Sequence, residues 1–342
     1  MIRIVAPVSS VNDTERVIAA GANEVYAGVL TSSWKRQYLN VAAANRREYS
    51  AANLRSYPEL ARVVSAAHRK RIPVAVTFNS FYSERQYPAV VTELNLALKT
   101  GVDAVIAADL GLICRLRKMR TPIHLSSGAT VFNSLALDFY RAQGVSRVIL
   151  PRHLAIPEIR RLSNSKKGLE IEVFIQNTRC INIDGFCTFL HGLPEISILG
   201  RIAKRMRMDY LAMTAAERAP WMKKYLSRLF GSTSACSLDY AIEGAVEGNY
   251  ALSSLFGPKP VNHCGACALY DLNAVDCIKI VGRENPSEKK ARDVTFMRRV
   301  RDSLKPSVSR TRFTAHAKRL FKETYGYSCR NCYYPEWKKR ST

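Results

Sequence analysis

Residues 147–176 read RVILPRHLAIPEIRRLSNSKKGLEIEVFIQ, and this stretch decides the fold class. Its two ends, Arg147–Leu150 and Ile171–Ile175, are short apolar runs rich in Val and Ile, which is typical of strands covered on both faces. The segment between them, Ile156–Leu162, is predicted to be a helix. Strand, helix and strand in this order form the unit of a parallel sheet, so the stretch predicts an α/β protein.

The same alternation runs through most of the chain. We predict strands at Arg3–Val5, Glu24–Ala27, Pro73–Thr77, Ala104–Ala107, Ile123–Leu125, Arg147–Leu150, Ile171–Ile175 and Cys277–Val281. The predicted helices lie at Asn12–Ala20, Ala52–Lys70, Ala89–Thr100, Leu110–Met119, Ser134–Gln143, Ile156–Leu162 and Pro286–Leu304. Gly21, Gly101 and Gly144 each follow a predicted helix and precede a strand, as expected of C-terminal helix caps.

Strands that alternate with helices in this number favour a closed (β/α)8 barrel of the TIM type. A doubly wound sheet is the alternative, but no Gly-x-Gly-x-x-Gly or Walker phosphate loop follows any predicted strand. We assign residues 1–305 to the barrel domain, which includes a basic, Cys-rich insertion at 178–276 before the last strand. Residues 306–342 form a basic C-terminal extension with a Cys-x-x-Cys pair.

The amino-acid composition is that of a globular protein and excludes several other classes. The 342 residues are 47% hydrophobic and 23% charged, which excludes a disordered tail, a collagen-like fibre and a disulfide-stapled miniprotein. No stretch has the length of a membrane span, and the N-terminus, MIRIVAPVSS, lacks the pattern of a signal peptide. We therefore expect a cytoplasmic protein with no membrane span.

The chain is strongly basic, with 52 Lys and Arg against 28 Asp and Glu and a net charge of +24. Such an excess raises the rate of encounter with polyanions and anionic substrates. Much of the charge lies in the insertion and the extension, where solvated helical faces are the simpler explanation. Aromatic residues suited to base stacking are interleaved with it: Tyr225, Phe230, Tyr325, Tyr327, Tyr333, Tyr334 and Trp337.

Nine cysteines in a chain without an export signal are expected to stay reduced, which favours metal ligands, redox groups or core residues over disulfides. Most of them lie in or next to the basic regions: Cys180, Cys187, Cys236, Cys264, Cys267, Cys277, Cys329 and Cys332. Cys114, in an apolar helical stretch, is predicted to be a buried core thiol. Four cysteine thiolates could bind either a structural zinc ion or an iron–sulfur cluster. The simpler alternative is that these cysteines bind no metal.

Two segments carry a family resemblance. Residues 168–192 read GLEIEVFIQNTRCINIDGFCTFLHG, and residues 278–284 read IKIVGRE. Together with the opening APVSS and AAGANEVYAGV, they resemble the signature segments of the collagenase-like peptidase family, peptidase family U32. The resemblance covers most of residues 1–305.

This resemblance implies a (β/α)8-type protein with a 4Fe–4S cluster held by four cysteines. It also implies an oxygen-independent hydroxylation, of a ubiquinone precursor or of an RNA base. Cys180 and Cys187 match the first two cluster ligands, and Cys236 is the best match to the third. The fourth is Cys264 or, alternatively, Cys267. Cys329 and Cys332 lie outside the resemblance and could form an additional pair of metal ligands.

The chain departs from the family pattern at strand ends that face the predicted site. Gln176 and Asn177 stand where the family has His-Gly, Gly128 where a Gln is common, and His153 where a Glu is usual. Val281 replaces the Glu of the Lys-Ile-Glu-Gly-Arg element. These differences leave the substrate open.

We expect an iron–sulfur hydroxylase or oxidoreductase that acts on a small anionic or aromatic substrate. Lys279, Arg283 and Arg152 are the candidate catalytic residues, because cations at strand ends can hold an anion. Tyr26, Asn79 and Asn177 are the candidate substrate-binding residues. Two of these residues have a simpler explanation, since Lys279 could pair with a barrel carboxylate and Tyr26 could serve packing.

Three alternatives remain at this point. The basic regions and their aromatic residues suit an RNA-modifying or RNA-binding protein. A peptidase is disfavoured, because the sequence has neither a His-Glu-x-x-His helix nor a Gly-x-Ser-x-Gly elbow. The chain could also act as one subunit beside a protein partner of the same family. Zinc is the alternative cofactor.

Overall fold

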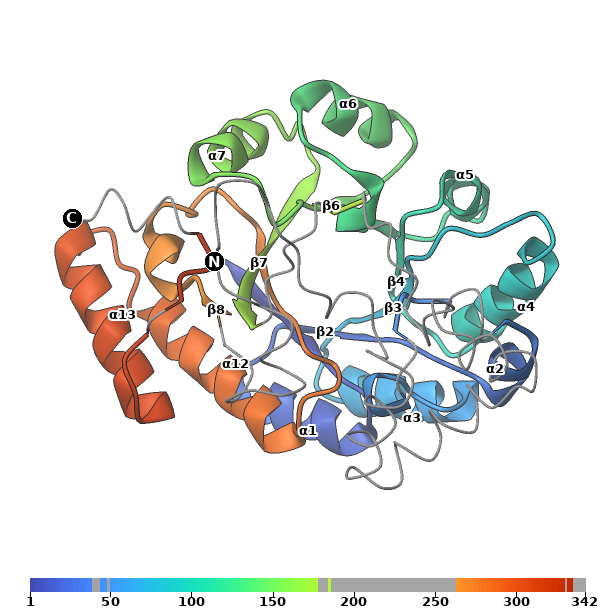
Figure 1. The fold of residues 1–342 in the computed structure, drawn as a ribbon, viewed down its shortest axis with the longest axis horizontal. Coiled ribbons are helices and arrows are strands. Elements are labelled where there is room, and N and C mark those ends of the chain that lie inside the picture. The colour runs from blue at the N-terminus through green and yellow to red at the C-terminus, as the bar shows by residue number, and fades with distance from the viewer. Residues whose placement is uncertain (39–43, 48–49, 178–183, 186–262, 330, 335–342) are drawn as a thin grey trace, which may run out of the picture.

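The computed structural model describes residues 1–38, 44–47, 50–177, 184–185, 263–329 and 331–334. Its centre is a ring of parallel strands (Figure 1). The strands are β1 (Arg3–Pro7), β2 (Glu24–Ala27), β3 (Val74–Phe78), β4 (Ala104–Ala107), β5 (Ile123–Leu125), β6 (Arg147–Ile149), β7 (Glu170–Asn177) and β9 (Cys277–Ile280). Each pairs with the next, β7 pairs with β9, and β9 pairs with β1, which closes the barrel.

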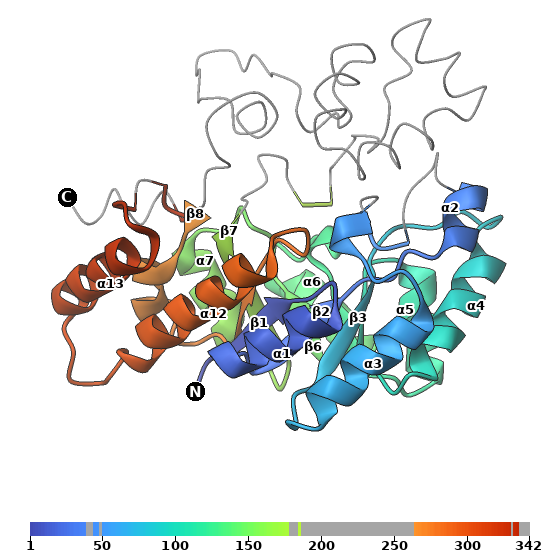
Figure 2. The ribbon, with the colours of Figure 1, turned by 90° about the horizontal axis from the view of Figure 1, so that it is seen from below.

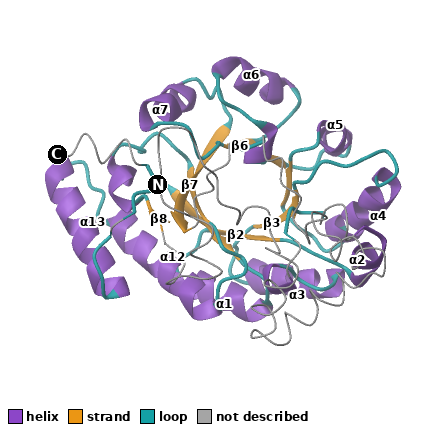
Figure 3. Cartoon of the chain, in the orientation of Figure 1, coloured by secondary structure: helices purple, strands orange, loops and turns teal. Residues whose placement is uncertain are grey.

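Helices surround the ring on its outside (Figure 3). They are α1 (Val11–Ala20), α2 (Ser32–Tyr38), α3 (Tyr57–His68), α4 (Tyr87–Leu98), α5 (Leu110–Lys118), α6 (Ser134–Ala142), α7 (Ile156–Asn164), α12 (Ser287–Asp302) and α13 (Arg310–Tyr325). Local chemistry sets their ends. The Ser10 side chain accepts from the backbone N–H of Asp13 to start α1, and Gly21 ends it at φ 108, where a glycine is favoured.

The predicted (β/α)8 barrel is confirmed, and every predicted strand is present to within one or two residues at each end. The helix predicted from Ala52 begins only at Tyr57, because Ser56 caps it and Leu54 pairs with Val29 instead. Among the α-helices and strands of the described residues, three were not predicted: α2, α13 and the two-residue strand β8 (His263–Cys264). Figure 2 shows α13 lying along the outside of α12.

Strand β8 connects the end of the insertion to the barrel. It pairs antiparallel with β7, with Asn177 opposite His263 and Gln176 opposite Cys264. The two ends of the segment between β7 and β8 are therefore held side by side at the carboxyl edge of the barrel. Most of the predicted insertion, 178–276, lies outside the described residues.

Cys114 was predicted to be a core thiol, and this is wrong: it is exposed on α5. The helix turns Leu112, Ile113 and Leu116 towards the barrel, which leaves Cys114 on the solvent side. Within the described residues, no helix is both long and apolar enough to cross a membrane.

A network of buried charges fills the amino half of the barrel. Arg147 Nη1 lies 2.7 Å from Glu24 Oε1 and 3.0 Å from Glu172 Oε2, and Lys279 Nζ lies 2.7 Å from Glu172 Oε1. Burial and the cations next to it, chiefly Arg147, lower the pKa of His124 to about 3. In the amino half of the barrel, paired charges therefore surround the neutral imidazole of His124.

This imidazole makes stability pH-dependent. In the folded chain His124 stays neutral down to about pH 3, whereas in the unfolded chain it takes up a proton below its ordinary pKa of 6.5. Its stabilising contribution is therefore complete above pH 6.5 and falls as the pH falls towards 3. Between pH 7 and pH 5 we expect the wild type to lose about 2 kcal/mol more of its free energy of unfolding than His124→Gln does. Urea unfolding of both proteins at the two pH values measures this difference, and equal losses would contradict it.

Candidate active site at the carboxyl end of the barrel

The carboxyl ends of the strands gather the polar groups that the predicted site requires, and this is the end of a (β/α)8 barrel where active sites are built. Arg283, three residues after β9, is only 5% exposed. Its Nη1 donates to Thr77 Oγ1 at 3.0 Å, and its Nη2 donates to Asn45 Oδ1 at 3.0 Å and to Asn45 O at 3.4 Å. The segment after α2, the end of β3 and the loop after β9 thus meet at one guanidinium.

Arg283 is unusual because all of these partners are neutral. Among the described residues, no carboxylate forms an ion pair with its guanidinium. Burial lowers the pKa of Arg283 to about 10, so the group keeps its charge at neutral pH. A buried cation without a protein anion is costly, and a bound carboxylate or phosphate would supply the missing charge.

Two glycines let arginines approach the barrel mouth. A Cβ at Gly28, just after β2, would lie 1.7 Å from Arg283 Nη1. A Cβ at Gly128, just after β5, would lie 3.0 Å from Arg46 Nη1. Any larger residue at position 28 would therefore displace the Arg283 side chain.

Asn79 follows β3 at the same end of the barrel. Its Nδ2 donates to Ser126 Oγ at 3.4 Å. Its Oδ1 is buried and accepts no hydrogen bond from the described part of the chain. An acceptor of this kind is suited to an N–H or O–H of a bound molecule. This position agrees with the predicted role of Asn79 in substrate binding, which stays a prediction.

The other predicted cation of the rim, Arg152, contacts the segment that carries the first two predicted cluster ligands. Asp184 lies between those cysteines in sequence. Its Oδ2 accepts from the Arg152 backbone N–H at 2.9 Å, and its Oδ1 lies 3.5 Å from Arg152 Nη1. Gly185 packs so closely that a Cβ there would lie 1.9 Å from Thr130 Cγ2. Asp184 and Gly185 therefore rest on the rim between β5 and β6.

Lys279 and Tyr26 lie deeper and are engaged within the barrel. The Lys279 ammonium pairs with Glu172 and sits 3.9 Å from the centroid of the Tyr26 ring. Tyr26 donates its hydroxyl hydrogen bond to Ile280 O at 3.1 Å. These contacts match the simpler explanation given for each residue, and a substrate that uses Lys279 would compete with Glu172.

Asn177 is held on the outer side of β7. Its Nδ2 donates to Val281 O at 2.8 Å and to Asp293 Oδ2 at 2.9 Å, and its Oδ1 accepts from Lys289 Nζ at 2.6 Å. The side chain therefore joins β7 to α12. Its backbone has φ 77, which the asparagine tolerates. The predicted substrate contact of Asn177 would have to replace these bonds.

The predicted metal ligands are only partly described. Cys180, Cys187 and Cys236 lie outside the described residues, so their predicted role stays a prediction. Cys264 lies in β8 and Cys267 in the 3-10 helix Ala266–Tyr270 that follows it. The extension returns to β8 and brings Cys332 into a bridge with Cys264. The predictions named Arg283 but missed Asn45 and Thr77, because only the fold brings these residues to it.

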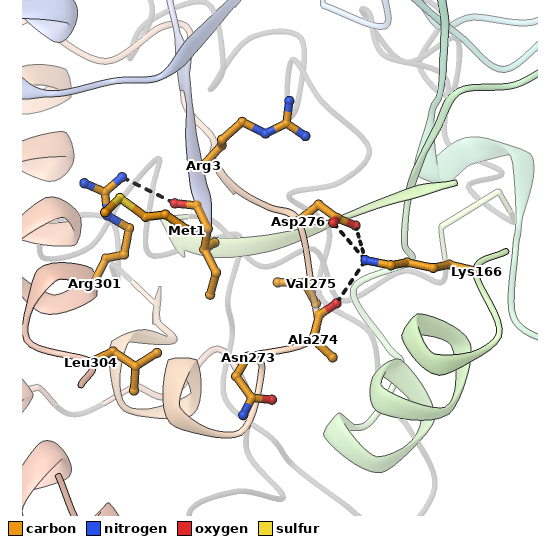
Figure 4. Close-up of a pocket in the computed structure, with 10 residues that line it drawn as sticks. Met1, Arg3, Lys166, Asn273, Ala274, Val275, Asp276, Arg301 and Leu304 are labelled. Atoms are coloured by element: carbon orange, nitrogen blue, oxygen red, sulfur yellow. Dashed lines mark hydrogen bonds and ion pairs between the residues drawn. The ribbon is translucent and has the colours of Figure 1, made fainter. Parts of the chain in front are cut away.

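A hollow of about 540 Å³ lies at the opposite, amino end of the barrel (Figure 4). There Lys166 Nζ is 2.8 Å from both oxygens of Asp276, and Arg301 Nη1 donates to Ile2 O at 3.3 Å. Lys166 pairs with Asp276 and Arg301 pairs with Asp302, and residues at this end of such barrels serve stability. We therefore place the candidate site at the carboxyl end.

Comparison with known proteins gives a family match. The model of peptidase family U32 matches residues 9–342. The chain is 28% identical over 186 residues to tRNA hydroxylation protein P of Escherichia coli, covering 54% of this chain and 38% of that protein. It is 29% identical over 191 residues to an uncharacterized protease of Methanocaldococcus jannaschii, covering 55% and 43%.

A longer alignment is found with tRNA hydroxylation protein P of Helicobacter pylori, at 23% identity over 334 residues, covering 95% of this chain and 71% of that protein. The chain spans less than half the length of the Escherichia coli and Methanocaldococcus jannaschii relatives.

Proposed function

Because the chain belongs to peptidase family U32, we propose that it is an RNA-modifying enzyme that hydroxylates a base of tRNA or rRNA. The observation that carries the proposal is the buried Arg283 guanidinium, which has only neutral partners among the described residues. RNA supplies an anion at every nucleotide. Relatives named for tRNA hydroxylation support RNA as the substrate.

The polar groups at the carboxyl end of the barrel suit the binding of one nucleotide that is turned out of an RNA strand. Enzymes that modify a base take it out of the stack and bind it in a pocket. Arg283 can hold the phosphate or another anionic group, and the free Oδ1 of Asn79 can accept from an N–H of the base. The net charge of +24 would attract the rest of the strand. A small anionic substrate would use the same groups but would leave this charge unused.

A peptidase fits the described residues less well. The thiol next to a histidine in sequence is Cys264, beside His263. This thiol is only 5% exposed. A nucleophilic cysteine has to be accessible to the bond it attacks, whereas a buried structural cysteine is inert.

We further propose that Cys180, Cys187 and Cys236 supply three of the four ligands of a 4Fe–4S cluster; the fourth, Cys264 or Cys267, stays a prediction. The contact of Asp184 and Gly185 with the rim supports this, because it anchors the segment between the first two of these cysteines next to the barrel mouth. A bound cluster would supply one-electron chemistry. Arg152 would position the segment through Asp184, and Arg283 and Asn79 would orient the substrate. The proposed partner of the same family and the cytoplasmic location remain predictions.

Nucleoside analysis tests the function. The full chain is expressed anaerobically in a host that lacks its own RNA hydroxylation proteins, and total tRNA and rRNA are digested and analysed by mass spectrometry. We expect a nucleoside heavier by one oxygen atom with the wild type. Cys187→Ala should remove at least about 90% of this product together with the iron in the purified protein, because thiolates are the cluster's ligands.

Cys114→Ala is the matched control, since its thiol is exposed on α5 and should change neither product nor iron. An iron-loaded wild type that yields no hydroxylated nucleoside would overturn the proposed reaction. Equal loss of iron in the Cys187 and Cys114 variants would overturn the assignment of the ligand.

A further inference from the structure

The two Cys-x-x-Cys pairs of the chain, Cys264 with Cys267 and Cys329 with Cys332, lie far apart in sequence but meet in space. The Cys264 backbone N–H donates to Asn331 O at 3.0 Å. The Tyr333 backbone N–H donates to Cys264 O at 3.1 Å, and Cys264 and Cys332 form a parallel bridge. The backbone of the extension therefore runs along β8 and places one pair next to the other.

The side chains of the two pairs face a common region. The Cys264 thiol shares a hydrogen bond with Cys329. Cys267 lies within electrostatic range of both Cys329 and Cys332. The first pair is therefore close to both cysteines of the second pair.

The surroundings are closed and well anchored. Cys264 is 5% exposed, and Tyr333 and Tyr334, which follow the second pair, are 0% and 3% exposed. The Tyr334 hydroxyl donates to Phe174 O on β7 at 2.7 Å. Residues 331–334 are therefore packed against the barrel wall, so the second pair has a defined position.

Two further features suit thiolates. The Cys264 sulfur accepts from the Ala266 backbone N–H at 3.5 Å, a bond that favours the charged form of a thiol. Lys318 on α13 lies within electrostatic range of Cys267, and it would offset part of the negative charge of a zinc ion with four thiolates. Both act on the first pair.

As protonated thiols, the sulfurs use other partners. Cys332 Sγ donates to Tyr334 O at 3.1 Å, Cys329 Sγ to Asn331 O at 3.9 Å, and Cys267 Sγ to Thr314 O at 4.0 Å. In the described ranges, no three Cys, His, Asp or Glu side chains surround one point as metal ligands do. Loss of the protons would free the four sulfurs to turn towards each other.

We propose that Cys264, Cys267, Cys329 and Cys332 form a four-thiolate site for one structural zinc ion, separate from the predicted cluster. Two Cys-x2-Cys pairs that converge are the usual ligands of a structural zinc, which is tetrahedral and leaves no position open for a substrate. The ion would fasten the extension to β8 and thereby to β7. Cys264 would then belong to the zinc site and not to the cluster.

Cobalt binding tests this proposal directly. The full chain, carrying Cys180→Ala and Cys187→Ala to remove the predicted cluster site, is stripped of metal and titrated anaerobically with Co²⁺. We expect one equivalent to give the intense visible bands and the sulfur-to-metal charge-transfer band of a tetrahedral thiolate site. Zinc should then displace the cobalt and remove both. Adding Cys329→Ser and Cys332→Ser should weaken binding more than about 100-fold, because two ligands are lost.

Cys114→Ser in the same background is the control and should bind like its parent. Limited proteolysis gives a second measurement: zinc should protect residues 326–334 from cleavage in the parent but not in the Cys329→Ser, Cys332→Ser protein. The proposal is overturned if the parent shows no thiolate spectrum, or if the two serine substitutions leave the spectrum and affinity unchanged. Iron in place of zinc in the purified Cys180→Ala, Cys187→Ala parent would overturn the assignment of the metal. None of these readouts depends on RNA hydroxylation.

Discussion

Replacing Arg147 by alanine should lower the free energy of unfolding by about 3–5 kcal/mol, because it leaves buried carboxylates without their cation. Arg147 is 2% exposed and lies 2.7 Å from Glu24 and 3.0 Å from Glu172. Lys279 would still pair with Glu172, whereas Glu24 would lose its principal partner. Urea unfolding followed by circular dichroism at neutral pH measures the loss.

Arg16→Ala is the matched control. Arg16 Nη1 lies 2.7 Å from Glu288 Oε1, the same distance as in the buried pair, but the two side chains are 46% and 72% exposed. Solvent screens such a pair, so its loss should cost no more than about 1 kcal/mol. If the two variants lost equal stability, burial would not be what makes the Arg147 network important.

The second large effect is expected at Arg283. Arg283→Lys should reduce formation of the hydroxylated nucleoside by about 100-fold or more, which corresponds to roughly 3 kcal/mol of transition-state stabilisation. A lysine keeps the charge but has a single donor head, which cannot reach Thr77, Asn45 and a bound anion together. Nucleoside mass spectrometry after anaerobic expression gives the product, and titration with a short RNA gives the affinity.

A second buried arginine provides the comparison. Arg301 is 9% exposed and donates to Ile2 O and Asn23 Oδ1, but it lies at the amino end of the barrel. Arg301→Lys should therefore keep most of the activity. Similar losses in both variants would mean that packing is responsible, and Arg283 would lose its proposed contact with the substrate.

The barrel could be predicted from the sequence because its strands are buried on both faces. Runs such as Ala104–Ala107 and Ile123–Leu125 are almost wholly apolar, and a glycine marks the turn before several of them. Strand β8 could not be predicted in this way, since its two residues pair only because the distant Gln176 and Asn177 lie beside them. The basic sequence of α13 hides its apolar stripe, of which Phe313, Leu320 and Phe321 are buried.

The candidate site could be predicted in part. The family resemblance pointed to Arg283 and to the cysteines. Because Arg283 follows the last strand, the sequence also predicted that it lies at the carboxyl end of the barrel. The partners of these residues depend on register. Lys279 meets Glu172 because β9 aligns with β7 so that Cys277 lies opposite Glu172. The meeting of the two Cys-x-x-Cys pairs depends on the path of the extension, which spacing along the chain does not encode.

The pairing of Asn177 with His263 has a consequence for how such proteins diverge. The barrel is complete without whatever joins those two residues, since β7 and β9 bond to each other directly. A connection whose ends are already neighbours pays little closure entropy for extra length. The connection between Asn177 and His263 could therefore change in length and composition while the strand order of the barrel stays the same.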